Sequence, residues 1–141
     1  MIIVDTNVVS EMMRAVPEPI VLRWFSSQAD EDLKITAITL AEILYGIELL
    51  PQGKRREALR TGAEKMFGVV FTGHILTFDD KAVRAFAVIT SSRRKQGRPI
   101  SDFDSQIAAI ARAHGATLAT RDTDDFEGCG VKLINPWEEG L

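Results

Sequence analysis

Cysteine and long apolar stretches are what this sequence most clearly lacks. Its single cysteine, Cys129, cannot form an internal disulfide, which favours a reducing compartment such as the cytosol. No apolar run approaches the ~20 residues that a membrane-spanning helix needs. The opening residues 1–5 are too few for the apolar region of a secretion signal and include no basic residue. We therefore expect a cytoplasmic protein that does not enter a membrane.

Histidine is also scarce, and the motifs of two cofactor classes are missing. His74 and His114 lie far apart in the sequence, and no cysteine–histidine spacing typical of zinc sites occurs. The Gly-Lys-Ser/Thr loop of many ATP-binding proteins is absent too. His114 precedes Gly115 and is most simply a cation at a helix C-terminus, and Cys129 is interpreted as a free structural thiol. Neither zinc nor ATP is implied.

The composition is that of an ordinary globular domain. The chain has 141 residues, 45% of them hydrophobic and 26% charged, which is enough for a sizeable core. We predict a single domain over residues 1–141. The 17 Lys and Arg against 20 Asp and Glu give a net charge of -3. Nucleic acid could therefore bind only where basic residues gather on one face.

Short apolar runs alternate with longer helical segments along the chain. This pattern predicts a three-layer α/β/α fold, Rossmann-like, with helices on both faces of a mostly parallel sheet of about four to five strands. Strands are expected at 2–4, 33–36, 75–78, 117–120 and 131–134. Helices are expected at 6–14, from about 21 to 25 after two prolines, and at 39–50, 54–68, 79–97 and 101–114.

Four acidic residues fall just after predicted strands or at the starts of predicted helices. Asp5 and Asp122 directly follow strands, and Glu42 and Asp104 lie in the first turns of helices. Ligands of a parallel sheet bind beyond the carboxyl ends of its strands, so these side chains are expected to converge. Close carboxylates repel unless a cation joins them, and Mg²⁺ or Mn²⁺ suits an all-oxygen site. The set predicts metal-assisted hydrolysis of a phosphodiester.

Each acid taken alone has a structural interpretation. Residues 39–42 and 101–104 both resemble capping boxes, in which the acid only satisfies a helix start. Asp5 could be a simple N-cap, and Asp122 could belong to a solvated acidic loop. Four such coincidences at one edge of one sheet are much less probable than one site.

The sequence resembles the PIN-domain family, and within it the VapC-type toxins and their FitB-like subgroup. The matching blocks are Val4-Asp5-Thr6-Asn7-Val8-Val9-Ser10-Glu11, Thr39-Leu40-Ala41-Glu42-Ile43-Leu44-Tyr45-Gly46, Asp104-Ser105-Gln106-Ile107-Ala108-Ala109-Ile110-Ala111, Leu118-Ala119-Thr120-Arg121-Asp122-Thr123-Asp124-Asp125-Phe126 and Ile134-Asn135-Pro136-Trp137. They span nearly the whole chain. The resemblance implies a PIN-like fold and an Mg²⁺- or Mn²⁺-dependent endoribonuclease, the toxin of a type II toxin–antitoxin pair.

The resemblance also implies roles for particular residues. Asp5, Glu42, Asp104 and Asp122 would form the acidic site, with Asp5 and Asp104 as direct metal ligands. Asn7 and Thr120 would support it through hydrogen bonds. In FitB-like relatives the position of Asp122 can be Asn with the acid three residues on, so Asp122, Asp124 and Asp125 all stay open as the residue nearest the metal. Asp102 would point elsewhere on its helix.

Nine basic residues fall in two segments. They are Lys54, Arg55, Arg56, Arg60 and Lys65 in the first, and Arg93, Arg94, Lys95 and Arg98 in the second. The first segment is equally well a solvated helix face. The second precedes Asp104, and we hypothesise that it holds RNA phosphates beside the acidic pocket.

The resemblance further implies a VapB-like antitoxin whose C-terminal segment presents a basic side chain to the carboxylates. It implies homodimers as well, and tetramers with antitoxin on promoter DNA. Met12, Met13, Leu44 and Tyr45 are candidates for interfaces, although a role in the core is as plausible for them.

Two other classes of protein compete with the nuclease. The first is a phosphotransfer or phosphatase domain, but a receiver domain would need a Lys after the last strand, and a haloacid-dehalogenase-type phosphatase would need Asp at position 7, which is Asn7. The second is a catalytically silent PIN-like binding module. Four mutually repelling carboxylates argue against it, because a silent site has no physical reason to keep them.

Overall fold

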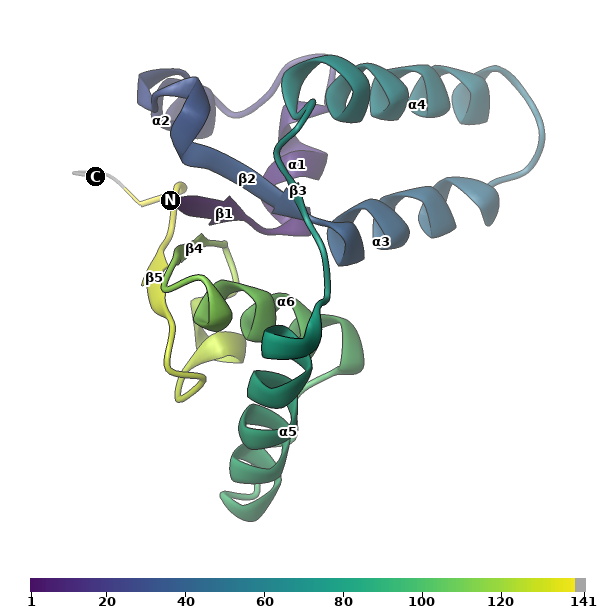
Figure 1. Cartoon of the computed structure of the whole chain (residues 1–141). Helices are drawn as coiled ribbons and strands as arrows, with labels where there is room; N and C mark the ends of the chain where they lie inside the picture. Colours follow the sequence, from purple (N-terminus) through teal and green to yellow (C-terminus); the bar gives the residue numbers. More distant parts are fainter. Residues whose placement is uncertain (139–141) are drawn as a thin grey trace.

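Five parallel strands form the centre of the computed structural model, which describes residues 1–138 (Figure 1). Within these residues the strands are β1 (Ile2–Val4), β2 (Leu33–Thr36), β3 (Ile75–Leu76), β4 (Thr117–Ala119) and β5 (Lys132–Ile134). Their order across the sheet is β3-β2-β1-β4-β5. The predicted three-layer fold with a parallel sheet is confirmed; the last three residues of the predicted domain lie outside the described part.

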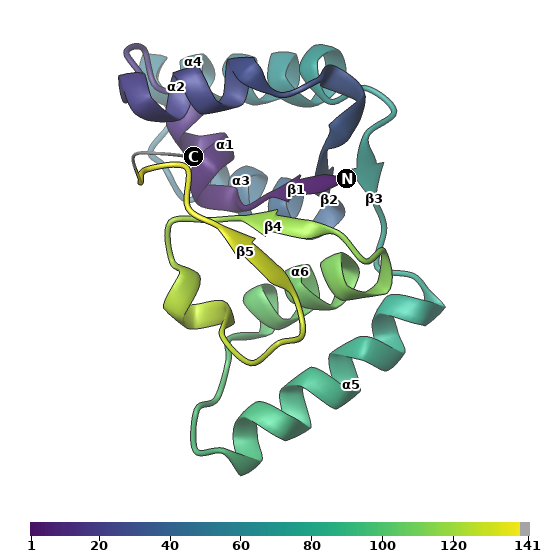
Figure 2. The ribbon, with the colours of Figure 1, turned by 90° about the vertical axis from the view of Figure 1, so that its left-hand side faces the viewer.

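Helices cover both faces of this sheet (Figure 2). They are α1 (Thr6–Met12), α2 (Pro19–Ser27), α3 (Ala37–Glu48), α4 (Lys54–Lys65), α5 (Asp80–Lys95) and α6 (Asp102–Ala113). One apolar cluster joins α1, α2, α3 and α4 to the sheet around Val8, Val21 and Ile43. A second cluster joins α5 and α6 to the other face around Ile89 and Ile107.

The strands are short and apolar because both of their faces are covered. Ile3 and Val4 of β1 and Leu118 of β4 have no exposed surface, and β1, at the centre of the sheet, contains apolar residues only. Helix α6 is similarly enclosed, and all five residues from Ile107 to Ala111 are fully buried. Its alanines let α6 pack closely between the sheet and α5.

The register brings two loops together at the switch point of the sheet. Val4 of β1 pairs with Ala119 of β4, and the amide of Asp5 donates a 2.9 Å hydrogen bond to the Ala119 carbonyl. Strand β1 lies between β2 and β4, so the connections lead away from it in opposite directions. A crevice opens at such a point beyond the carboxyl ends of the strands.

Several predicted boundaries differ from those in the structure. Helix α3 begins at Ala37 with Thr36 as its N-cap, so Glu42 lies in the second turn and not in the first. Strand β3 ends at Leu76, two residues early. Helix α4 ends at Lys65 and a π-helical turn, η2 (Met66–Val70), follows. The 3₁₀ turns η1 (Asp30–Asp32) and η3 (Thr123–Phe126) have no strong local sequence pattern and were not predicted.

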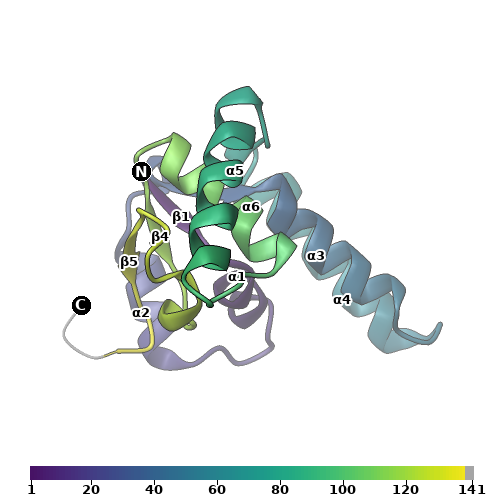
Figure 3. The ribbon, with the colours of Figure 1, turned by 90° about the horizontal axis from the view of Figure 1, so that it is seen from below.

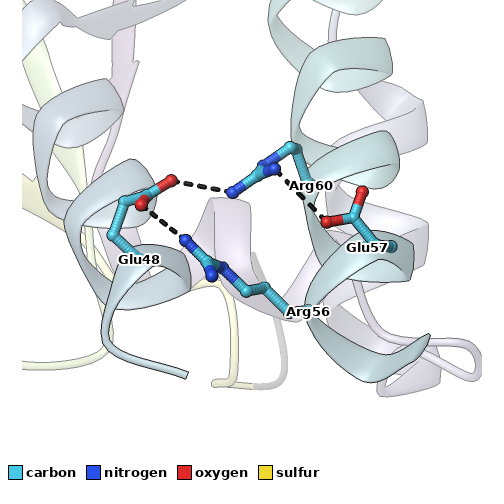
Figure 4. A network of polar contacts seen from close by, with 4 residues as sticks. All are labelled: Glu48, Arg56, Glu57 and Arg60. Atoms are coloured by element: carbon cyan, nitrogen blue, oxygen red, sulfur yellow. Dashed lines mark hydrogen bonds and ion pairs between the residues drawn. The ribbon is translucent and has the colours of Figure 1, made fainter. Parts of the chain in front are cut away.

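Helices α3 and α4 form a hairpin that projects from the sheet (Figure 3). Glu48 of α3 accepts from Arg56 at 2.6 Å and from Arg60 at 2.8 Å, and Arg60 also pairs with Glu57 at 3.3 Å (Figure 4). Two cations of the first basic segment therefore hold the hairpin together. Within residues 1–138 no helix combines the length and the apolar character that crossing a bilayer requires.

Candidate active site

Asp5 is the most buried carboxylate of the site. It ends β1 and caps α1, and only 5% of its surface is exposed. Its Oδ1 accepts a hydrogen bond from the Thr6 amide at 2.8 Å, and its Oδ2 accepts one from the Thr120 hydroxyl at 2.7 Å. Both oxygens are thus held in place, and each keeps a lone pair for a further ligand.

The Thr120 hydroxyl connects Asp5 to the loop after β4. While donating to Asp5, it accepts from the Asp122 amide at 3.1 Å and from Asn7 Nδ2 at 3.3 Å. The same Asn7 amide group donates to Asp122 Oδ2 at 3.1 Å, and Asn7 Oδ1 accepts from the Arg121 amide at 3.4 Å. These bonds set the position of Asp122 relative to Asp5.

Glu42 reaches the site from α3 on the side of β2. Its Oε1 accepts a 2.9 Å hydrogen bond from the Thr6 hydroxyl, which also lies 3.1 Å from the hydroxyl of Thr39. Thr39 in turn donates its amide to the Thr36 hydroxyl at 3.1 Å. The turn at the start of α3 therefore orients Thr6, and Thr6 orients the carboxylate.

Asp104 lies in the first turn of α6, on the other face of the sheet. Ser101 is the N-cap of this helix, and its hydroxyl accepts from the Asp104 amide at 3.2 Å. This capping bond fixes the backbone but leaves the Asp104 carboxylate directed at the loop crevice.

The four predicted acids all line one cavity of about 500 Å³. Asn7, which was expected to support the site, lines the cavity too. The structure adds six lining residues that were not predicted from the sequence: Thr6, Ser10, Glu11, Arg14, Arg121 and Trp137. Glu11, Arg121 and Trp137 stood in the sequence blocks typical of the family, which is the signal that could have found them.

The three open alternatives around Asp122 are separated by position. Asp122 lines the acidic cavity, whereas Asp125 lines a neighbouring cavity of about 200 Å³, which it shares with Asp104 and Arg93. Asp124 lines neither of these two cavities. Asp122 is therefore the acid of this loop that faces Asp5, and Asp125 approaches Asp104 from its other side.

Burial and mutual repulsion raise the pKa values of three of these acids. The pKa of Asp5 is raised to about 6, mainly by desolvation. The hydrogen bonds from Thr120 and Thr6 lower this pKa, whereas the charges of Asp104 and Glu42 raise it further. Desolvation also raises the pKa of Glu42, to which Asp104 contributes. The pKa of Asp104 rises through desolvation and then through Asp125 and Asp122. A cation among these groups would remove this unfavourable energy.

The donor set fits a hard divalent ion that keeps part of its water. All the candidate ligands are carboxylate oxygens, which Mg²⁺ and Mn²⁺ prefer. In the part of the chain that the structure describes, no three His, Cys, Asp or Glu side chains are grouped tightly enough to hold an ion among them. Mg²⁺ is usually bound through one or two carboxylates and retained waters. Binding through two carboxylates and retained waters does not require three such side chains around one ion.

The hypothesis that Arg93 holds RNA phosphates is wrong. Arg93 is only 4% exposed, and its guanidinium donates to the carbonyls of Arg98 at 2.7 Å, Asp125 at 2.8 Å and Glu127 at 3.0 Å. A positive charge that is buried must be satisfied in this way, and here the loops around α5 and η3 provide the acceptors. Arg93 is a structural residue that fastens the loop carrying Asp125.

The other members of this basic segment lie away from the acidic cavity. Arg98 donates to the Asp124 carbonyl at 3.3 Å and pairs with Glu127 at 3.5 Å. Arg94 and Lys95 are exposed on α5, and neither lines the acidic cavity. A role for these three in RNA binding therefore stays a prediction for the outer surface.

The structure also shows the environments of Cys129 and of the four candidate interface residues. Cys129 is buried and free, with its sulfur 3.5 Å from Arg93 Nη1. Met12 and Met13 pack against the apolar core, whereas Leu44 and Tyr45 are 40% and 59% exposed. The core interpretation holds for the methionines, and the α3 residues remain candidates for an interface.

These features define a class of protein: a parallel α/β fold with a carboxylate pocket at its switch point. The chain belongs to the PIN-domain family, whose model matches residues 2–130. It is 45% identical over 138 residues to the plasmid stability protein StbB of Pseudomonas syringae pv. tomato, covering 98% of this chain and 99% of that protein. It is 42% identical to the VapC ribonuclease Y4jK of Sinorhizobium fredii, with 98% and 99% covered.

Solved structures agree with these matches. The toxin FitB of Neisseria gonorrhoeae is 40% identical over 99% of this chain and 100% of that protein. The structure of FitAcB from Neisseria gonorrhoeae superposes with a TM-score of 0.87 at 39% identity, covering 98% of this chain and 99% of the other. The structure of FitAB bound to an IR36 DNA fragment superposes with a TM-score of 0.89 at 40% identity, covering 98% of this chain and 96% of the other. The backbone on which the four acids stand is therefore that of these relatives.

Proposed function

We propose that this protein is a metal-dependent endoribonuclease and the toxin of a type II toxin–antitoxin module. The observation that carries the proposal is the convergence of Asp5, Glu42, Asp104 and Asp122 on one cavity. The similarity to a VapC ribonuclease and to the toxin FitB supports RNA as the substrate and toxicity as the outcome. The reaction would take place in the cytosol, in a single domain of residues 1–141.

In the proposed site Asp5 and Asp104 hold Mg²⁺ or Mn²⁺. When bound, the ion lowers the pKa of a coordinated water and offsets charge on the phosphodiester in the transition state. Asp5 is prepared for this by the bonds from Thr6 and Thr120, which fix its carboxylate before the ion arrives. Asp122 is held in the same way by Asn7.

Glu42 is the proposed proton acceptor. Its Oε1 is occupied by the Thr6 hydroxyl, which leaves Oε2 to take a proton from the attacking water. The water oxygen forms the new bond to phosphorus, and the bridging oxygen of the phosphodiester departs with a proton from solvent. Burial is the largest cause of the raised pKa of Glu42, ahead of the charge of Asp104, and a carboxylate with a raised pKa accepts a proton more readily.

The proposed partner is a VapB-like antitoxin. An apolar groove of about 300 Å³ between α1 and the α3–α4 hairpin adjoins the acidic cavity and shares Thr6, Ser10, Arg14 and Glu42 with it. A peptide lying in this groove could place a basic side chain among the carboxylates. We propose homodimers, and higher assemblies with antitoxin on promoter DNA; the similarity to the structure of FitAB bound to an IR36 DNA fragment supports an assembly on DNA.

The test is cleavage of a panel of single-stranded and structured RNAs with Mg²⁺, Mn²⁺ or EDTA. Asp5→Asn and Asp104→Asn should each reduce cleavage by about a hundredfold or more, the usual scale for lost metal ligands or electrostatic groups. Asp80→Asn is the matched control, because this α5 carboxylate is 83% exposed and outside the cavity. A folded wild type that cleaves no RNA with either metal would favour the silent binding module.

A further inference from the structure

Arg121 and Trp137 form a cation–π pair on the rim of the acidic cavity. The Arg121 guanidinium carbon lies 5.1 Å from the centroid of the Trp137 ring, and both side chains line the cavity. Arg121 follows β4 and Trp137 follows β5, so two neighbouring strand ends supply them. Neither residue has a part in holding the carboxylates through its side chain.

Arg121 differs from the other cation of the cavity. Arg14 donates a 2.9 Å hydrogen bond to Glu11, a carboxylate that is itself buried. The Arg121 guanidinium takes part in no ion pair among residues 1–138, and it is exposed to solvent. A guanidinium that is neutralised by a neighbour has little left to offer a ligand, so Arg121 is the cation of this rim that can serve an anion.

The backbone and the ring both hold this cation in place. The Arg121 amide donates to Asn7 Oδ1 at 3.4 Å, within the network that also positions Asp122. The Trp137 amide donates to Asn135 Oδ1 at 2.9 Å, and the indole packs against the apolar core on the α1 side. The Arg121 guanidinium thus lies over an indole whose backbone and ring are both anchored.

The cation–π contact leaves the N–H groups of Arg121 available. The guanidinium lies over the Trp137 ring, and none of its N–H groups donates a hydrogen bond to another group within residues 1–138. The edge of a guanidinium matches two oxygens of a phosphate in bidentate geometry. A phosphodiester approaching four carboxylates is repelled, and a fixed cation at the rim offsets part of that repulsion.

We infer that Arg121 binds a backbone phosphate of single-stranded RNA next to the scissile one, and that Trp137 is the positioning residue that orients its guanidinium. This inference rests on the proposed ribonuclease function. It assigns the phosphate contact beside the acidic cavity, which buried Arg93 does not make, to the rim formed by the ends of β4 and β5.

The experiment measures steady-state cleavage, at several salt concentrations in Mg²⁺, of a fluorescein-labelled single-stranded RNA that the wild type cuts. Arg121→Ala should raise KM about tenfold with kcat changed less than about twofold, because a uniform binding contact is lost. The slope of log(kcat/KM) against log[salt] should become shallower by about one. Arg121→Lys should give a KM between those of the wild type and Arg121→Ala, because Lys keeps the charge but lacks the planar guanidinium.

Arg84→Ala is the matched control. This α5 arginine is 77% exposed, and its loss changes the net charge equally without touching the cavity. It should leave KM and the salt slope as in the wild type. Trp137→Leu should raise KM in the wild type but add little to Arg121→Ala, since the ring acts through the guanidinium. Because Arg121 is exposed, its substitution tests the inference even if Trp137→Leu fails to fold.

The outcomes separate this inference from the function beneath it. An active Arg121→Ala with unchanged KM and salt slope overturns the inference and leaves the ribonuclease standing. If that variant cuts RNA normally but resists the antitoxin, the rim binds a protein and the inference is again overturned. A wild type that cuts no RNA removes both.

Discussion

The hydroxyl of Thr120 donates a 2.7 Å hydrogen bond to Oδ2 of Asp5, across 115 positions of sequence. The bond joins the ends of β1 and β4 at the switch point of the sheet. The same hydroxyl accepts from Asn7 and from the Asp122 amide, so one small side chain organises two of the four carboxylates. Removal of the Thr120 hydroxyl should change the pKa of Asp5 and the position of Asp122.

Thr120→Val tests this role with nearly unchanged volume. The variant leaves the buried Asp5 oxygen and the Asp122 amide without a partner, which should cost about 1–3 kcal/mol of unfolding free energy by urea denaturation. The lost hydrogen bond lowered the pKa of Asp5, so the acidic limb of the pH–rate profile should move to higher pH. Thr120→Ser keeps the hydroxyl and should behave like the wild type; equal losses in both variants would point to packing instead.

Stability of the metal-free protein should fall as pH rises through the titration of Asp5. Burial raises the pKa of this carboxyl from 3.8 to about 6. The folded state then binds the proton more tightly, so the stabilisation is complete below the unfolded pKa and is lost as pH rises through about 6. The change corresponds to about 3 kcal/mol. Asp5→Asn should flatten the curve of Tm against pH measured in EDTA, and curves that stay parallel would contradict the shift.

Divalent metal should stabilise the folded chain. A ligand that binds only the folded state raises Tm with its concentration, and each kcal/mol of linkage is worth about 3 °C for a domain of this size. Thermal melts with added Mg²⁺ or Mn²⁺ should show the rise in wild type and in Asp80→Asn. Asp104→Asn should reduce it strongly. A rise of equal size in Asp104→Asn would show that the ion binds elsewhere.

Arg93 should matter more for stability than any other basic residue of its segment. Its loss leaves three loop carbonyls without their hydrogen-bond donor. Arg93→Met should therefore cost about 2–4 kcal/mol in urea unfolding. Arg94→Ala, one position away and exposed, should change stability by less than about 0.5 kcal/mol. If both variants unfold at the wild-type urea concentration, the buried bonds carry no net energy.

The carboxylate pocket could be predicted from the sequence because each acid is tied to a strand end or a helix start. Runs such as Ile2–Val4 show both the strand and its burial, and a parallel sheet then places Asp5 and Asp122 on one edge. Geometry at helix ends was less accessible. The capping-box pattern at residues 39–42 predicted a helix start at Thr39, whereas in the structure α3 begins at Ala37 with Thr36 as its N-cap.

Arg93 could not be distinguished from its neighbours by sequence. A cluster of arginines has the same pattern whether its members face solvent or loops, and two of the three carbonyls that Arg93 binds lie 32 and 34 residues away. Backbone acceptors leave no mark in side-chain identity. The pair of Arg121 and Trp137 was hidden for a related reason, since the ends of two different strands bring the ring and the cation together.

The strand order has a consequence for synthesis on the ribosome. Strand β1 emerges early, but β4, which pairs with it and supplies Thr120, emerges more than a hundred residues later. Contacts so distant in sequence form late and slowly. A growing chain therefore holds Asp5 and Glu42 long before the loop that carries Asp122 exists to complete the pocket. The acidic cavity of a nascent chain therefore stays incomplete until the end of β4 and the loop that follows it have left the exit tunnel.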